Sequence, residues 1–175
     1  ATGTAFGSGI YPRDLNAITS INGTGTPSTP DSISIKYNAS SDPCGGSTTG
    51  LTTYRFFIYN NSFSCDYNTP GNTSPSIDDD IPLIEDVINM QVLFGVDTDT
   101  SRPPTIATQY LNDIGTGVMV NGRQARERVI SIRIAVLLRS SDTLAESCGA
   151  GPFQLLDQSI SIPVTSCFLH RVVIT

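Results

Sequence analysis

The chain has 175 residues, 38% of them hydrophobic and 15% charged, with a net charge of −6 at pH 7. This length suits a single domain, which we expect to span residues 1–175, and the hydrophobic content argues against a disordered chain. A negative net charge with one lysine, Lys36, excludes nucleic-acid binding by bulk electrostatic attraction.

The first part of the chain predicts strands after an irregular start. Residues 1–30 are rich in Gly, Thr, Ser and Pro and predict an irregular leading segment. Residues 32–38 alternate between apolar and polar side chains and predict a strand. Residues 51–59 carry aromatic side chains on both faces, so we expect a central strand there. A turn at residues 60–61 then leads into a short strand near residues 63–67.

The middle of the chain predicts a strand, an acidic turn and a short helix. Residues 84–96 form an amphipathic pattern in which Met90, Val92 and Phe94 alternate with more polar neighbours. An acidic turn follows at residues 97–101. Residues 103–115 begin with two prolines and end with a glycine, and large apolar side chains recur every four residues between them. This pattern predicts a helix of about three turns.

Residues 129–140 give the strongest strand signal in the chain. The apolar side chains at the even positions predict one buried face: Ile130, Ile132, Ile134, Val136 and Leu138. The odd positions include Ser131, Arg133 and Arg139. Further strands are predicted at residues 160–164 and 168–174. Just before this strand stand Arg123, Arg126 and Arg128, which we interpret as a solvated loop, so direct DNA binding is not expected.

The four cysteines are Cys44, Cys65, Cys148 and Cys167. They lack the close spacing of zinc ligands, and their even number favours two disulfides in an oxidising compartment. Three pairings exist, of which Cys44–Cys65 with Cys148–Cys167 is favoured because each bond would join neighbouring strands. The alternative is four buried free thiols in a cytosolic protein.

Two segments together carry a family resemblance. "IEDVINMQVLFGVDTD" at residues 84–99 and "RVISIRIAVLLRS" at residues 128–140 resemble the PilW-type minor pilins of type IV pili, in order and in rough spacing. The resemblance is strong over residues 81–140 and fainter over residues 30–65 and 169–173. It implies an α+β, pilin-like fold of mostly antiparallel β-sheet with a short helix.

The resemblance also implies a structural role. PilW-like proteins carry an N-terminal apolar helix that anchors them in the inner membrane and lies across the sheet. This chain starts at Ala1 and has no apolar run near the ~20 residues that span a bilayer. We therefore interpret it as an ectodomain from which that helix was removed. The expected partners are other minor pilins and the major pilin, first at the periplasmic face of the inner membrane and then in the extracellular pilus.

Asp97 and Asp99 are the candidate metal ligands. Oxygen-bearing side chains at alternate positions of a tight turn can converge on a calcium ion. Related pilins often have a Gly-Asp extension after the second Asp, which this chain lacks. Arg102 offers the alternative, because its guanidinium could pair with either carboxylate in place of a cation. No other cofactor is expected.

Arg133, Leu137 and Arg139 are the candidate partner-contact residues. They lie on the odd face of the strand at residues 129–140. We expect removal of the N-terminal helix to uncover part of this face, including Ala135 and Leu137, and exposed apolar patches mark contact surfaces. The alternative is a solvent-exposed face along which the arginine stems lie.

No enzyme activity is expected from this chain. It has one histidine, His170, without the nucleophile motif of a hydrolase. The predicted function is a minor pilin that primes pilus assembly at the tip, in support of motility, adhesion or DNA uptake. Two alternatives remain: a minor pseudopilin of a type II secretion system, and a secreted β-sandwich adhesin or carbohydrate-binding module.

Overall fold

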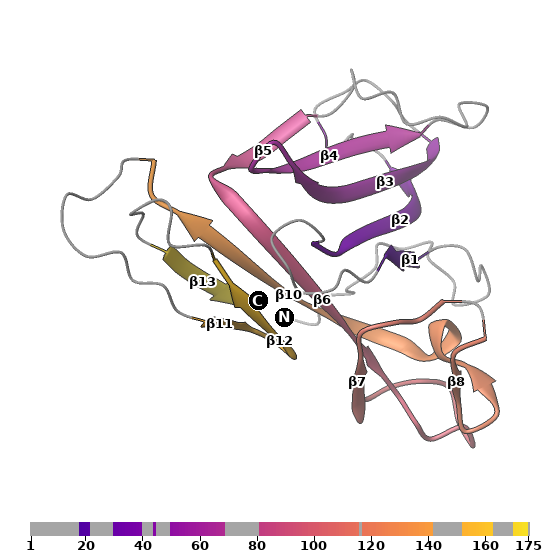
Figure 1. The fold of residues 1–175 in the computed structure, drawn as a ribbon. Coiled ribbons are helices and arrows are strands. Elements are labelled where there is room, and N and C mark those ends of the chain that lie inside the picture. The colour runs from indigo at the N-terminus through magenta and orange to yellow at the C-terminus, as the bar shows by residue number, and fades with distance from the viewer. Residues whose placement is uncertain are drawn as a thin grey trace.

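The computed structural model describes residues 18–21, 30–39, 44, 50–68, 81–115, 117–141, 152–162 and 170–174. Two antiparallel sheets dominate this part of the chain (Figure 1). The described residues contain no α-helix; their only helical element is the 3₁₀ helix η2 (Ala125–Arg128). The mostly antiparallel β architecture expected from the sequence is therefore confirmed, and the short helix is not.

The first sheet is a meander with strand order β1-β2-β3-β4-β5. Its strands are β1 (Ile18–Ile21), β2 (Ser32–Ala39), β3 (Gly50–Tyr59), β4 (Ser62–Asn68) and β5 (Ile81–Glu85). The central place expected for β3 is confirmed. A two-residue turn joins β3 to β4, with both Asn60 and Asn61 at positive φ, which matches the twist of a hairpin. The segment expected to be irregular nevertheless contains β1, since this short strand pairs with β2.

The second sheet has the strand order β13-β10-β6-β7. Its strands are β6 (Val87–Val96), β7 (Gln109–Leu111), β10 (Val129–Arg139) and β13 (His170–Ile174). Two hairpins complete the described fold: β8 (Met119–Val120) with β9 (Arg123–Gln124), and β11 (Pro152–Leu155) with β12 (Gln158–Ser161). The strand expected at residues 160–164 ends at Ser161, and that expected at residues 168–174 is described from His170.

The chain passes from one sheet to the other at Asp86, between β5 and β6. Asp86 adopts a positive φ of 57°, which turns the backbone sharply between the two strands. The corner is held by the Val87 amide, which donates to the Asn61 carbonyl (2.9 Å), and by the Arg139 amide, which donates to the Asp86 carbonyl (2.9 Å). These two hydrogen bonds and the conformation of Asp86 set the direction in which β6 runs from the first sheet.

The main core lies between the two sheets. On β6, Met90, Val92, Phe94 and Val96 are fully buried. They stand beside the even positions of β10, since Phe94 pairs with Ile132 and Val92 with Ile134. Side chains of the first sheet, including Ile33 and Phe56, pack onto this face. The even face of β10 therefore faces the core as predicted, but its side chains are only half-buried.

A buried aspartate ties the two sheets together at the start of β2. The Asp31 carboxylate accepts a hydrogen bond from the Val92 amide (2.8 Å), and the Asp31 amide donates to the Met90 carbonyl (2.9 Å). These contacts satisfy backbone groups on the edge of β6 beyond the end of β7.

The odd face of β10 is covered, which contradicts the expectation that it would be open. Ala135 and Leu137 are fully buried in a second core with Leu155 of β11 and Ile160 of β12. Figure 1 shows this hairpin beside β10 and β13, on the side away from the first sheet. The sheet therefore has apolar cover on both faces, and Leu137 is a core residue.

The segment at residues 103–115 contradicts the helix prediction. The amides of Thr105 and Ile106 donate to the Asp97 carboxylate (2.8 and 3.3 Å), which holds this segment against the end of β6. The Thr108 amide then donates to the Val96 carbonyl (2.9 Å), and Gln109–Leu111 pairs with β6 as strand β7. Tertiary hydrogen bonds override the local periodicity.

Candidate functional site

The acidic turn that follows β6 is built around the carboxylate of Asp97. Its side chain has no solvent-exposed surface. The Asp97 amide donates to the Arg128 carbonyl (3.0 Å), which places the turn against the residue that precedes β10. The pairing of β6 with β10, which this hydrogen bond extends by one residue, therefore places the Asp97 carboxylate in the interior.

Both oxygens of the Asp97 carboxylate are hydrogen-bonded. Oδ2 accepts from the Thr105 and Ile106 amides and from Arg102 Nη1 (2.9 Å). Oδ1 accepts from the Asp99 amide (3.0 Å). The pKa of Asp97 is held far below its ordinary value, first by the hydrogen bond from the Thr105 amide and then by that from the Asp99 amide. Asp97 is therefore a charged structural centre.

Arg102 occupies the place at which a cation was expected. Its Nη1 lies 2.9 Å from Asp97 Oδ2 and its Nε lies 2.9 Å from Asp99 Oδ2. The same guanidinium donates to the hydroxyl of Thr105. The pKa of Asp99 is also lowered, mainly because the Ser101 hydroxyl and amide donate to its carboxylate. The ion pair that the sequence offered as the alternative to calcium is present.

Arg128 closes the turn from the other side, and sequence reasoning missed it. Its side chain is buried. Nε donates to the Asp97 carbonyl (3.0 Å), Nη1 donates to the Arg102 carbonyl (2.9 Å), and Nη2 donates to the Asp99 carbonyl. The interpretation of Arg128 as part of a solvated loop is wrong, because its side chain is buried and donates to three backbone carbonyls of the turn.

An open cleft of about 320 Å³ lies beside this turn. It is lined by Thr100, Ser101, Arg102, Pro103, Arg123, Glu127 and Arg128. Arg102 and Arg128 already bind groups of the protein, and the lining contains one negative side chain, Glu127, beside the remaining positive one, Arg123. The cleft therefore offers no surplus of positive charge to an anion.

Across the described residues, no group of three or more His, Cys, Asp or Glu side chains is placed to hold a metal ion. The calcium site predicted at Asp97 and Asp99 has a competitor in Arg102, which pairs with both carboxylates. Because protein donors use the carboxylate oxygens of Asp97, we expect millimolar Ca²⁺ to leave the melting temperature of the wild-type domain unchanged. In Arg102→Ala, calcium should raise the melting temperature by replacing the lost positive charge. A rise in the wild type that Asp97→Ala abolishes would contradict this expectation.

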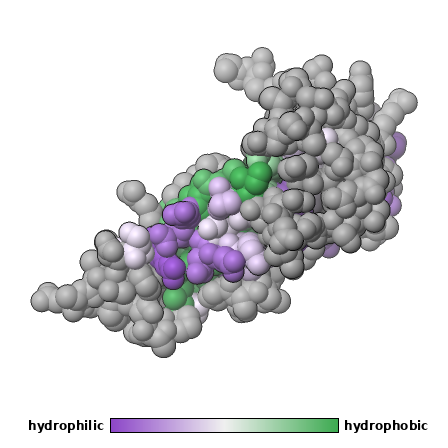
Figure 2. All heavy atoms as spheres, turned by 90° about the horizontal axis from the view of Figure 1, so that it is seen from above, coloured by the Kyte–Doolittle hydropathy of each residue, from purple (hydrophilic) through white to green (hydrophobic). Residues whose placement is uncertain are grey.

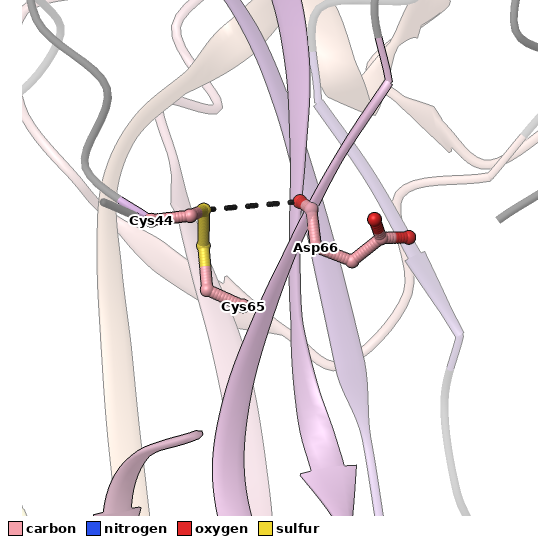
Figure 3. Close-up of a disulfide and its surroundings, with 3 residues drawn as sticks. All are labelled: Cys44, Cys65 and Asp66. Atoms are coloured by element: carbon pink, nitrogen blue, oxygen red, sulfur yellow. Dashed lines mark hydrogen bonds between the residues drawn. A yellow bond between two sulfur atoms is a disulfide. The ribbon is translucent and has the colours of Figure 1, made fainter. Parts of the chain in front are cut away.

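One of the two predicted disulfides lies among the described residues. Cys44 and Cys65 are bonded, with their Cα atoms 5.6 Å apart, and both are buried beside Tyr54, Phe56 and Ile81. Figure 3 shows the bond beside Asp66, whose carbonyl oxygen lies 3.9 Å from the Cys44 sulfur. A disulfide sulfur carries no proton, so we treat this approach as a packing contact. Cys148 and Cys167 lie outside the described residues.

Removing the Cys44–Cys65 bond should lower the free energy of unfolding by roughly 3 kcal/mol, because it constrains a loop of this size in the unfolded chain. The variant is Cys44→Ala with Cys65→Ala, and the measurement is urea denaturation. A further loss on adding dithiothreitol to this double variant would report a second disulfide, expected between Cys148 and Cys167. Non-reducing peptide mapping that found Cys44 bonded to Cys148 would contradict the pairing.

The three candidate partner-contact residues have separate environments. Arg133 is exposed and its guanidinium lies 4.0 Å from the centre of the Tyr110 ring. The Tyr110 ring lies close to the backbone of Gly95, which has no side chain. A Cβ added at Gly95 would lie 3.0 Å from this ring. Leu137 is buried, and Arg139 Nε pairs with Asp86 Oδ1 (3.2 Å) at the corner between the sheets. The three do not form one contact surface.

The described side chains define a structural domain: two packed antiparallel sheets, an internally paired acidic turn and a buried disulfide. The lone histidine, His170, stands opposite Arg139 in the register of β13 with β10, and its side chain is not among those described. No helix in the described part of the chain is long and apolar enough to cross a membrane.

Residues 53–174 match the family model described as PilW, Type IV Pilus-assembly protein W. This match covers more than half of the chain, which therefore belongs to the PilW family and is a component of type IV pilus assembly. The chain is also similar to the solved structure of a type IV-like pilin, TTHA1219 from Thermus thermophilus. The two are 10% identical with a TM-score of 0.48, and the match covers 91% of this chain and 79% of the other. The comparison with curated proteins finds no match.

Proposed function

We propose that this chain is the ectodomain of a minor pilin that joins a minor-pilin complex, primes type IV pilus assembly and lies at the pilus tip. The observation that carries the proposal is the PilW match over residues 53–174. The arrangement of β6 and β10 supports it, because the two motif segments that resemble the family pair directly with each other. They form the centre of the second sheet rather than two unrelated surface segments.

The proposed location follows from this role: the periplasmic face of the inner membrane before assembly, and the extracellular pilus afterwards. The buried Cys44–Cys65 disulfide agrees with an oxidising compartment. Motility, adhesion or DNA uptake would depend on the assembled pilus. Direct DNA contact is not part of the proposal, since Arg128, one of the three clustered arginines, is committed to backbone carbonyls.

We place the contact with the family's N-terminal helix on the even face of β10. The odd face is excluded at Ala135 and Leu137, which are buried by the β11–β12 hairpin. On the even face, Ile132, Ile134 and Val136 pack against the main core yet remain half-buried. Apolar side chains left partly open beside a core are suited to packing an apolar helix.

Deletion of the gene tests the proposed function. Cells without it should display few or no surface pili, and the full-length gene should restore them. Loss of protein secretion with normal pili would favour a type II secretion system. Normal pili and normal secretion, together with binding of the domain to a glycan, would favour an adhesin.

A further inference from the structure

Two hairpin turns among the described residues begin with an asparagine at positive φ. Asn60 opens the two-residue turn between β3 and β4, and Asn121 opens the one between β8 and β9. Both asparagines are exposed. The second turn residue differs, since Asn61 carries a side chain and Gly122 does not. The chain therefore presents the same turn position twice, and at Asn121 it is followed by glycine.

An Asn-Gly pair is the dipeptide most prone to deamidation, the main chemical lability of asparagine. The glycine amide nitrogen loses its proton, attacks the asparagine Cγ and expels the side-chain nitrogen as ammonia. Water then adds across one C–N bond of the succinimide and gives aspartate or isoaspartate. A Cβ on the second residue hinders the attack. At Gly122 there is none, and a Cβ built there would meet no other part of the chain within 4 Å. The approach to this nitrogen is therefore open.

The folded chain restrains the Asn121 side chain. Its Nδ2 donates to the carbonyl of Thr98 (2.7 Å), which lies between the two aspartates of the acidic turn. Thr98 is held by Thr108, whose hydroxyl accepts from the Thr98 amide (2.9 Å) and lies 2.8 Å from the Thr98 hydroxyl. Ring closure requires the Asn121 side chain to rotate toward the Gly122 nitrogen, so its hydrogen bond to Thr98 must break first.

We propose that Asn121 is a deamidation site protected by the acidic turn, and that the reaction proceeds when the β8–β9 hairpin separates from this turn. The inference goes beyond the proposed function, since it depends on no partner of the chain. The product also changes the contact, because a carboxylate has no hydrogen to donate and would set an oxygen against the Thr98 carbonyl. Deamidation therefore removes the restraint that delays it.

The first test is peptide mapping by mass spectrometry after incubation of the domain at mildly alkaline pH, with and without urea. Deamidation at Asn121 should be about tenfold slower in native buffer than in urea, because unfolding releases both the hydrogen bond and the turn. In urea, Asn121 should react faster than Asn60. Thr108→Val should raise the native rate about twofold or more, since it frees Thr98. The matched control is Thr53→Val on β3, which should leave that rate unchanged.

The second test measures the effect of the product. Asn121→Asp should lower the melting temperature by about 3 °C, because it loses the hydrogen bond to Thr98. Asn60→Asp is the matched control, since it makes the same change at the same turn position in the first sheet and should leave the melting temperature unchanged. That sheet lies in the upper part of Figure 1, far from β8, and the view from above shows hydrophilic side chains beside a hydrophobic strip (Figure 2).

An intact Asn121 after incubation in urea would remove the site, and equal rates in native buffer and in urea would remove its protection. Either result overturns the inference and leaves the proposed function standing. An unchanged rate in a Thr108→Val domain that circular dichroism shows to be folded would contradict the part given to the acidic turn. Equal melting temperatures of Asn121→Asp and Asn60→Asp would contradict the effect assigned to the product.

Discussion

Leu137→Ala should lower the free energy of unfolding by about 2–5 kcal/mol, although the sequence suggested that Leu137 contacts a partner. The side chain is fully buried between β10 and the β11–β12 hairpin, where it packs with Leu155 and Ile160. Its removal leaves a cavity that these short strands can close only in part. Leu137→Glu should prevent folding, because it would place a carboxylate in the apolar core that Leu155 and Ile160 form against the odd face.

Leu138→Ala is the matched control. It removes the same atoms from the next residue, whose side chain points to the opposite face and is half-buried, so the expected loss is about 1 kcal/mol. Urea denaturation of both variants gives the comparison. Equal losses would show that the hairpin does not cover the odd face, and a stable Leu137→Glu domain would restore that face as a contact surface.

Asp97→Ala should lower the melting temperature by on the order of 10 °C. The substitution leaves the amides of Thr105 and Ile106 without an acceptor and removes the partner that Arg102 holds at 2.9 Å. Asp99→Ala is the control, because its carboxylate is 45% exposed and its ion pair is screened by water. A loss no larger for Asp97→Ala than for Asp99→Ala would contradict the central place given to Asp97.

The same carboxylate predicts how stability depends on pH. The pKa of Asp97 is lower in the folded chain than its ordinary value of about 4, so its contribution to stability is complete above about pH 5. It should be lost progressively as the pH falls below about 5, because the unfolded chain then binds a proton that the folded chain does not. Thermal melts of the wild type should show this fall, and Asp97→Asn should make it shallower. Parallel curves for the two proteins would contradict the assignment.

The strands were the predictable part of the fold. The alternation of apolar residues located β6 and β10, and the aromatic side chains on both faces of residues 51–59 placed β3 at the centre of its sheet. A period of two identifies two faces, but it does not say which will be covered. The cover over Leu137 comes from β11 and β12, two four-residue strands whose patterns are too short to predict where they pack.

The acidic turn shows where local patterns fail. The apolar spacing of residues 103–115 suits a helix. In the structure, the amides of Thr105 and Ile106 instead donate hydrogen bonds to Asp97, a residue outside that segment. Arg128 gave no sequence signal for its role, since its three carbonyl partners lie 26 or more residues away along the chain. The hairpin at Asn121-Gly122 was not among the predictions, although this pair is a strong turn signal and both residues adopt positive φ.

Light scattering coupled to size-exclusion chromatography tests the central claim most directly. The wild-type domain is mixed with the ectodomains of the minor pilins encoded beside it, and the mass of the mixture is measured. Membership of a minor-pilin complex predicts a new species whose mass is the sum of this chain and at least one partner. If every mixture elutes as separate monomers at concentrations well above the micromolar range, where weak specific interfaces still associate, the account is contradicted.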